Sequence, residues 1–165
     1  MTEVLQCNSV GTYDQYFFWG KANKVLAVNA PDDDNGSGIG AYIVTSGRQS
    51  FLLAASSLPS GTTINSVTIR SRITQSPNLS TYQPFLRLGG VEVYGPSQTP
   101  SNVWETRLDT ISRPGGSSWT VADLATLEIG YWCDSGDYLW VCTAEAVIDY
   151  SAPGPGGTGD MLLVF

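Results

Sequence analysis

The 165-residue chain contains no histidine and only two lysines, and no apolar stretch in it is long enough for a signal peptide or a membrane-spanning helix. Without histidine the chain lacks the commonest general acid–base group and the commonest zinc ligand. Its net charge is −7, so it presents no basic surface for the phosphates of nucleic acids or for anionic lipids. We therefore expect no nucleic acid and no membrane among its partners, and we expect synthesis in a cytoplasm.

Cysteine is also scarce. Cys7, Cys133 and Cys142 are odd in number and stand at no metal-binding spacing. The sequence therefore predicts free, partly buried thiols.

Hydrophobic residues make up 42% of the chain and charged residues 14%, which is typical of a globular protein, and 18 glycines with 9 prolines predict frequent turns. Helical periodicity is nearly absent, and alternating β-branched and aromatic residues replace it. The clearest strand is expected over residues 63–73, where Val67, Ile69 and Ile73 share one face. Further strands are expected over residues 12–19, 39–45, 48–54, 81–94, 102–110, 127–133 and 138–150. Gly89-Gly90 interrupts residues 81–94 and suits a bulge or a hairpin turn.

About nine or ten strands joined by short turns predict an all-β fold, a jelly-roll or related Greek-key β-sandwich. Residues 1–29 are expected to form an N-terminal strand or arm, and residues 30–150 the sandwich domain. Residues 151–165 have the composition of a Gly/Pro-rich linker followed by an apolar C-terminal segment.

One short helical corner is expected after Trp119. Thr120 is a suitable N-cap, and Asp123, three residues later, completes a capping box. Leu124 and Leu127 would face the core, and Gly130 leaves room for about two helical turns at most.

The two strands after this corner are expected to form a hairpin around residues 134–137 that ends at Tyr150. A three-residue loop would place Trp132 opposite Trp140, an aromatic cross-strand pair that would hold the register. Cys133 would then face Leu139, which argues against a disulfide with Cys142.

The densest polar cluster, residues 32–38, has two interpretations. Oxygens of Asp32 and Asp34 are suitable calcium ligands, although the spacing is not that of an EF-hand. We favour a solvated turn, since aspartates in such turns bond backbone amides. No other cofactor is expected.

The sequence offers no catalytic constellation, and we expect a protein that is not an enzyme. Without histidine, acid–base chemistry would fall to carboxylates, tyrosine, lysine or cysteine, and nothing in the sequence pairs two carboxylates in a cleft for glycoside hydrolysis. Glu128 and Glu145 are expected on the wet faces of their strands, because acids are rarely buried.

The five tryptophans and eight tyrosines also allow two interpretations. Exposed rings would form a sugar-stacking platform, whereas buried rings would fill the core and the subunit contacts. We favour core and contacts, and we expect the contacts in both terminal regions, at Tyr16, Phe17, Phe18, Trp19, Met161, Leu162, Leu163, Val164 and Phe165.

Several segments together resemble virion proteins of tailed bacteriophages. The first is an acidic turn at residues 32–34, and the second is a Pro-Gly turn that leads into a long strand, at Leu58–Arg72. The others are a Trp-Thr corner, at Trp119–Gly130, and a closing strand that ends in Asp-Tyr, at Ala144–Tyr150. Tyr42-Ile43 and Phe51-Leu-Leu belong to the same succession. The resemblance covers most of residues 30–150 and supplies no catalytic residues.

This resemblance implies a structural protein of the virion, made in the host cytoplasm. The expected role is capsid decoration or cement, as a homo-oligomer such as a trimer that binds a major capsid or tail protein. A tail or fibre component or a self-assembling filament subunit is a close variant. A carbohydrate-binding, lectin-like module is the alternative from another class.

Overall fold

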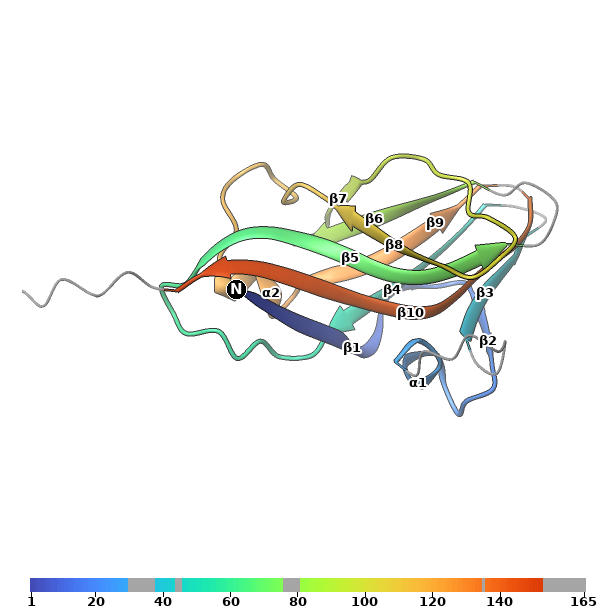
Figure 1. Ribbon diagram of the computed structural model, residues 1–165, viewed down its shortest axis with the longest axis horizontal. Coiled ribbons are helices and arrows are strands. Elements are labelled where there is room, and N and C mark those ends of the chain that lie inside the picture. The colour runs from blue at the N-terminus through green and yellow to red at the C-terminus, as the bar shows by residue number, and fades with distance from the viewer. Residues whose placement is uncertain (30–37, 44–45, 76–80, 135, 153–165) are drawn as a thin grey trace, which may run out of the picture.

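A computed structural model describes residues 1–29, 38–43, 46–75, 81–134 and 136–152. All pairs among its ten strands are antiparallel, and the strands build two sheets that pack face to face (Figure 1). The predicted all-β sandwich is confirmed. In chain order the strands are β1 (Thr2–Asp14), β2 (Phe17–Trp19), β3 (Gly38–Ile43), β4 (Gly47–Leu53), β5 (Thr63–Gln75), β6 (Tyr82–Leu88), β7 (Val91–Tyr94), β8 (Glu105–Thr110), β9 (Glu128–Cys133) and β10 (Gly136–Ser151).

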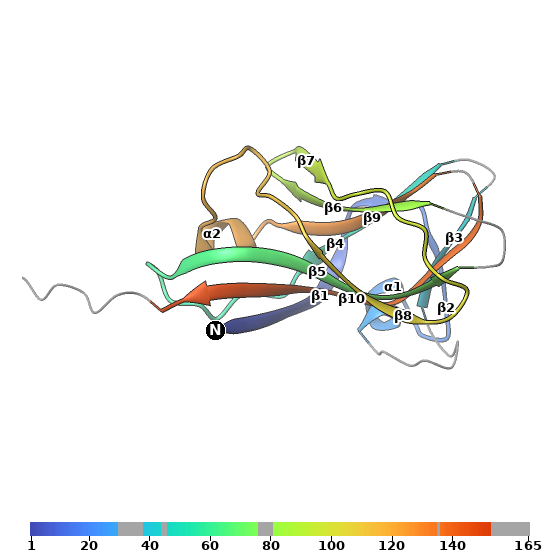
Figure 2. The ribbon, with the colours of Figure 1, turned by 45° about the horizontal axis from the view of Figure 1, so that its top comes forward.

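We call the sheet around β10 sheet A. β5 pairs along nearly all of β10, and β8 pairs with β5. On its other side, β10 pairs with β3 and then with the start of β1, and β2 extends β3 at the edge. Sheet B has the order β1, β4, β9, β6, β7. Because β1 pairs with β10 in sheet A and with β4 in sheet B, it joins the two layers, which Figure 2 shows from a second side.

The core lies between the sheets. Val67, Ile69 and Ile73 of β5 face it and are fully buried, as their alternation predicts. Each such side chain contributes on the order of 2 kcal/mol by leaving water. The fourth member of this face, Ser71, is buried as well, and its hydroxyl is hydrogen-bonded to that of Tyr131 at 2.7 Å.

The predicted hairpin between the last two strands is wrong. Trp132 lies in sheet B opposite Arg48, whereas Trp140 lies in sheet A opposite Gly40, so the two tryptophans do not pair. The apolar face of β9 packs against that of β10 across the core, which buries both faces; a hairpin would have placed them side by side in one sheet. Cys133 consequently faces Gly47 instead of Leu139. All three cysteines are free, as predicted, and fully in the interior.

The predicted helical corner is confirmed. Helix α2 (Val121–Leu124) follows Trp119, and Thr120 and Asp123 form the full capping box. Leu124 and Leu127 are both buried in the core. The turn before β5 has Gly61 at φ +83°, a conformation that favours glycine.

A second helix, α1 (Lys24–Val28), was not predicted. Asn23 caps it by accepting a hydrogen bond from the Leu26 amide at 3.0 Å, and it buries Ala27 and Val28. Five residues are too few for a periodic signal, so packing against the sandwich, and not intrinsic propensity, holds this helix.

The N-terminal residues belong to the sandwich. Leu5 and Cys7 are in the core, and the Met1 ammonium group donates a hydrogen bond to the Tyr150 carbonyl at 2.9 Å. The start of β1 and the end of β10 therefore lie at the same end of the molecule (Figure 1).

Candidate functional site

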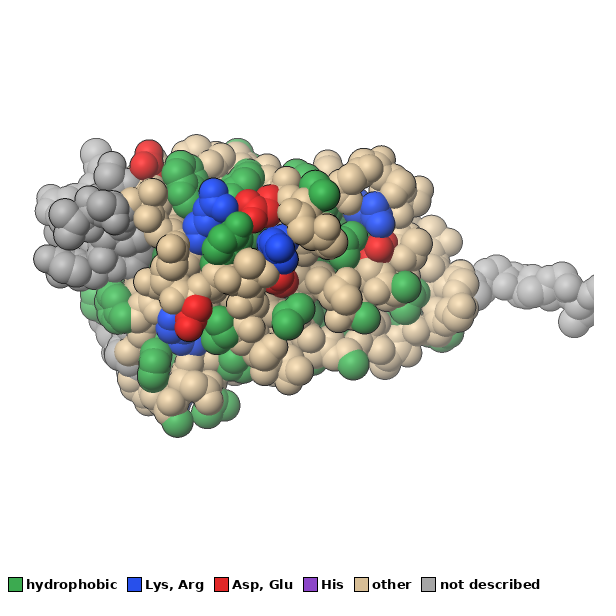
Figure 3. All heavy atoms as spheres, turned by 180° about the vertical axis from the view of Figure 1, so that it is seen from behind, with side chains coloured by type: hydrophobic (Ala, Val, Ile, Leu, Met, Phe, Trp, Pro, Cys, Tyr) green, Lys and Arg blue, Asp and Glu red, His purple; other side chains and the backbone are tan. Residues whose placement is uncertain are grey.

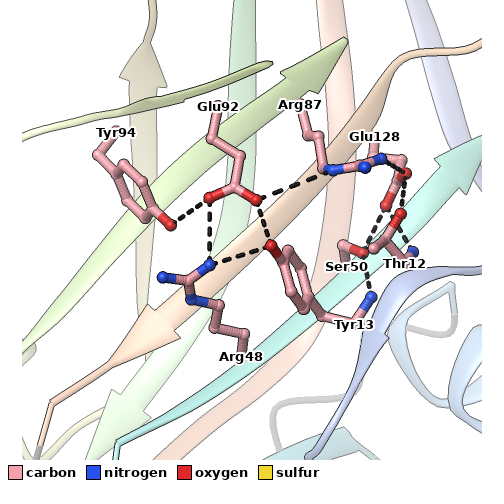
Figure 4. Close-up of polar contacts among 8 residues, drawn as sticks. All are labelled: Thr12, Tyr13, Arg48, Ser50, Arg87, Glu92, Tyr94 and Glu128. Carbon is pink, nitrogen blue, oxygen red and sulfur yellow. Dashed lines mark hydrogen bonds and ion pairs between the residues drawn. The ribbon is translucent and has the colours of Figure 1, made fainter. Parts of the chain in front are cut away.

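The outer face of sheet B carries an unusual mixture of aromatic and charged side chains. On β9, Tyr131 and Cys133 point to the core, so Glu128 and Trp132 point outward. The same alternation turns outward residues of β4, β6 and β7. With two residues of β1 they form what we call the outer-face network, drawn in Figure 4: Thr12, Tyr13, Arg48, Ser50, Arg87, Glu92, Tyr94 and Glu128.

An aromatic cluster underlies this network. Phe85 is fully buried on the outer face, where it lies over Gly130; a Cβ at Gly130 would stand 2.4 Å from the Phe85 ring. The ring centroid of Phe85 is 6.0 Å from that of Tyr13 and 5.4 Å from that of Tyr94. Trp132 continues the cluster, 6.4 Å from Tyr94 in an edge-to-face arrangement. Tyr13, Tyr94 and Trp132 are all half-buried and reach the surface.

Glu92 is the first centre of the network. It accepts hydrogen bonds from the hydroxyls of Tyr13 and of Tyr94, the latter at 2.5 Å, and it pairs with Arg48 at 3.2 Å. Burial alone would raise the pKa of Glu92, but these hydrogen bonds and the charges of Arg48 and Arg87 outweigh it and hold that pKa below its ordinary value. The Glu92 carboxylate is therefore ionised near neutral pH.

Arg48 is held between two rings. Its guanidinium carbon lies 5.0 Å from the Tyr13 centroid and 5.7 Å from the Tyr94 centroid, and it donates a hydrogen bond to the Tyr13 hydroxyl at 3.0 Å. Burial, then the hydrogen bond to Glu92, raises the pKa of Tyr94 to about 12. Tyr94 is thus a neutral donor at physiological pH.

Glu128 is the second centre. One oxygen accepts from the Thr12 amide and the Ser50 hydroxyl, each at 2.6 Å, and the other accepts from the Thr12 hydroxyl at 2.6 Å and from Arg87 at 2.7 Å. Burial opposes ionisation of Glu128, but the four donors lower its pKa. Glu128 faces outward as predicted, yet it is only 5% exposed, because β1 and Arg87 cover it.

The second predicted wet-face acid, Glu145, is also nearly buried. It lies on sheet A, is 8% exposed and forms an ion pair with Arg70. The expectation that these two glutamates are solvated is wrong for both, since each is covered by its arginine partner.

The face of the molecule that carries the outer-face network is seen from behind. Figure 3 shows acidic and basic side chains in contact with hydrophobic ones near the middle of this face. The network contributes two arginines and two glutamates, so its own formal charge is zero.

The other predicted site residues are placed as follows. Tyr16 is 2% exposed and its amide donates to the Gln49 side chain, so its assignment to a subunit contact is wrong. Phe17 and Phe18 are 41% and 42% exposed, and Trp19 pairs through its backbone with Gly38. The candidate calcium ligands Asp32 and Asp34 and the segment Met161–Phe165 lie outside the described residues. Within the described part of the chain, no cluster of three or more His, Cys, Asp or Glu residues is arranged to hold a metal ion.

The sequence interpretation missed Tyr13, Arg48, Arg87, Glu92 and Tyr94. Alternation along each strand puts Arg48 and Arg87 on outward positions, and the same signal was present for Glu92 and Tyr94 around the Gly89-Gly90 turn. That these strands are neighbours in one sheet is not readable from local pattern. Of the helices formed by the described residues, none is long and apolar enough to cross a membrane.

The sequence matches no known protein-family model and no curated protein. Solved structures with a similar fold include TmCBM61 in complex with β-1,4-galactotriose, with a TM-score of 0.46 and 11% identity over 88% of this chain and 86% of that chain. CtCBM11, in solution, has a TM-score of 0.46 and 12% identity over 88% of this chain and 94% of that chain. A likeness of this degree transfers neither a ligand nor a site to this protein.

Proposed function

We propose that the protein is a non-catalytic carbohydrate-binding domain, and that its glycan lies on the outer face of sheet B. The observation that supports this is the set of surface-reaching rings, Tyr13, Tyr94 and Trp132, beside fixed arginine and glutamate side chains. Sugar rings have an apolar face and a rim of hydroxyls, so recognition needs an aromatic surface together with firmly held polar groups.

The proposed ligand is a neutral glycan. Arg48 and Arg87 are compensated by Glu92 and Glu128, and the whole chain has a net charge of −7, so an acidic polysaccharide would be repelled. Because Arg48 and Glu92 are already held by Tyr13 and Tyr94, few side chains need to be ordered when the ligand binds.

The test is binding to a panel of soluble neutral oligosaccharides, measured by titration calorimetry. Trp132→Ala removes a surface ring from the sheet B face and is expected to raise Kd at least about tenfold. Trp140→Ala is the matched control, since Trp140 is a half-buried, outward-facing tryptophan of sheet A. Equal Kd values for the Trp132→Ala variant and the unmodified protein would overturn the proposed position of the ligand.

Self-association as a virion structural protein, such as a capsid decoration protein, is the second candidate. It is supported by Phe17 and Phe18, which are exposed on β2, the edge strand of sheet A among the described residues. Replacing both by serine is expected to convert an oligomer to monomers in sedimentation velocity, as is deletion of residues 160–165. Leu26→Ser, at an exposed leucine on α1, serves as the control. A monomeric unmodified protein would remove this candidate.

A further inference from the structure

Besides Trp132, Trp119 also reaches the surface, and it lies in the loop that precedes α2. Trp119 packs against the core with part of its side chain and remains half-exposed. Two open grooves adjoin it. One, of about 530 Å³, runs between Trp119, Gly61 and Ala122, and the other, of about 410 Å³, runs between Trp119, Asn65 and the neighbouring serines.

The loop that presents Trp119 is held rigidly. Arg113 donates two hydrogen bonds of 2.9 Å to the Asp123 carboxylate and a third, of 2.7 Å, to the Ser117 hydroxyl. Asp123 in turn accepts from the Thr120 amide at 2.8 Å. Hydrogen bonds therefore hold the loop on both sides of Trp119. Little conformational entropy is lost when a ligand binds to the ring.

The grooves have the chemistry of a site for a neutral polyhydroxyl compound. Apart from the indole, side chains with hydroxyl or amide groups predominate in them, including Ser60, Asn65 and Ser118. Among the described residues that line the grooves, the one charged side chain is that of Arg113, and Asp123 neutralises it. Each volume falls within the range of small-molecule sites, roughly 300–1,000 Å³.

One polar group in the first groove is unpartnered. Thr62 lines this groove and is 7% exposed, and its hydroxyl has no hydrogen-bond partner among the residues that the structure describes. Buried hydroxyls are normally satisfied, so a buried water is expected to bridge this oxygen to a neighbouring polar group beneath the groove.

We propose that the two grooves beside Trp119 form a second carbohydrate site. This site binds the terminal sugar of a neutral oligosaccharide next to α2. The ligand class is that of the proposed function, so this inference rests on it, but the residues are separate from those of the outer-face network. The terminal sugar of the oligosaccharide would bind here with one face on the indole and with hydroxyls hydrogen-bonded to exposed serines such as Ser118.

The experiment follows the five tryptophan indole N–H signals of the full chain by NMR during titration with the same neutral oligosaccharides. Trp→Phe variants at residues 119 and 132 assign the two relevant signals. We expect the Trp119 signal to shift with saturation, independently of Trp132. Ala122→Arg, which places a long side chain in the first groove from an exposed helix position, should weaken this shift at least about tenfold in Kd. Ala125→Arg, at the exposed C-cap residue that follows the same helix and lies outside the lining of both grooves, is the matched control.

The outcomes separate the two proposals. A shift of Trp132 alone overturns the second site and leaves the sheet B site standing. A shift of Trp119 alone, abolished by Ala122→Arg, supports the second site and overturns the sheet B position. If neither signal moves with any oligosaccharide, both sites are refuted. A Trp119 shift that Ala122→Arg and Ala125→Arg leave equally unchanged also refutes the groove.

Discussion

Replacing Glu128 by glutamine tests whether the outer-face network is a fixed structure. Glutamine keeps the shape of the side chain but offers one acceptor oxygen in place of two. The carboxylate oxygens receive four hydrogen bonds, two of them from Thr12 and the others from Ser50 and Arg87. Whichever way the amide is turned, either the Thr12 amide or Arg87 faces an NH₂ group and loses its partner.

The expected cost is about 3 kcal/mol. A charged hydrogen bond contributes about 1.5–3 kcal/mol, and the bonds that remain become neutral ones, which are about half as strong. Arg87 is still 24% exposed, so water compensates part of its loss, and the sum is smaller than the full penalty for breaking a buried ion pair. For a domain of this size, such a loss lowers Tm by about 6–12 °C.

Urea unfolding of the Glu128→Gln variant, with an unchanged m-value, measures this loss. Glu145→Gln is the control: Glu145 is similarly buried, but its partner Arg70 is 40% exposed, so we expect about 1 kcal/mol or less. A loss below 1 kcal/mol for Glu128→Gln, or equal losses in both variants, would refute the account of Glu128 as the centre of a buried network.

Three further measurements test the same structure. Gly130→Ala places a Cβ 2.4 Å from Phe85 and 2.5 Å from the Gln49 carbonyl, and should cost at least about 2 kcal/mol in urea unfolding; a neutral effect would show that Phe85 does not lie there. Thr120→Ala removes the N-cap of α2 and should cost about 1 kcal/mol, with Thr120→Ser restoring most of it. The folded-state pKa values of Glu92 and Glu128 are depressed, so their contribution to stability is complete above their ordinary value of 4.5 and is lost as the pH falls through the folded values. Unfolding free energies that stay constant from pH 6 down to about pH 3 would contradict this.

The features that were predicted correctly depend only on residues close together in the chain. The capping box of Thr120 and Asp123 and the alternating face of β5 are local patterns, and both are present. The assumption that consecutive strands pair failed at Trp132 and Trp140, because the chain crosses from sheet B to sheet A between them. Local alternation cannot distinguish a hairpin from such a crossing, since both alternate in the same way.

The outer-face network escaped prediction for a related reason. Tyr13, Arg48, Glu92 and Glu128 come from four strands far apart in the chain, and only the order of strands in sheet B brings them together. The burial of Glu128 was missed because a lone acid in a strand normally faces water, and its cover is supplied by β1 and β6.

The protonation states of the outer-face network bear on the choice between the proposed glycan binding and glycoside hydrolysis. A glycosidase needs one carboxylic acid that keeps its proton near neutral pH, which requires a raised pKa, beside a second carboxylate. Despite burial, hydrogen bonds and neighbouring arginines lower the pKa of Glu92 and of Glu128, so both carboxylates are ionised near neutral pH and neither has the raised pKa of a general acid. Burial does raise the pKa of Asp109, but Asp109 lies on β8 of sheet A, away from this face. The same hydrogen bonds that hold Glu92 in a fixed position beside Arg48 therefore also favour its ionised form.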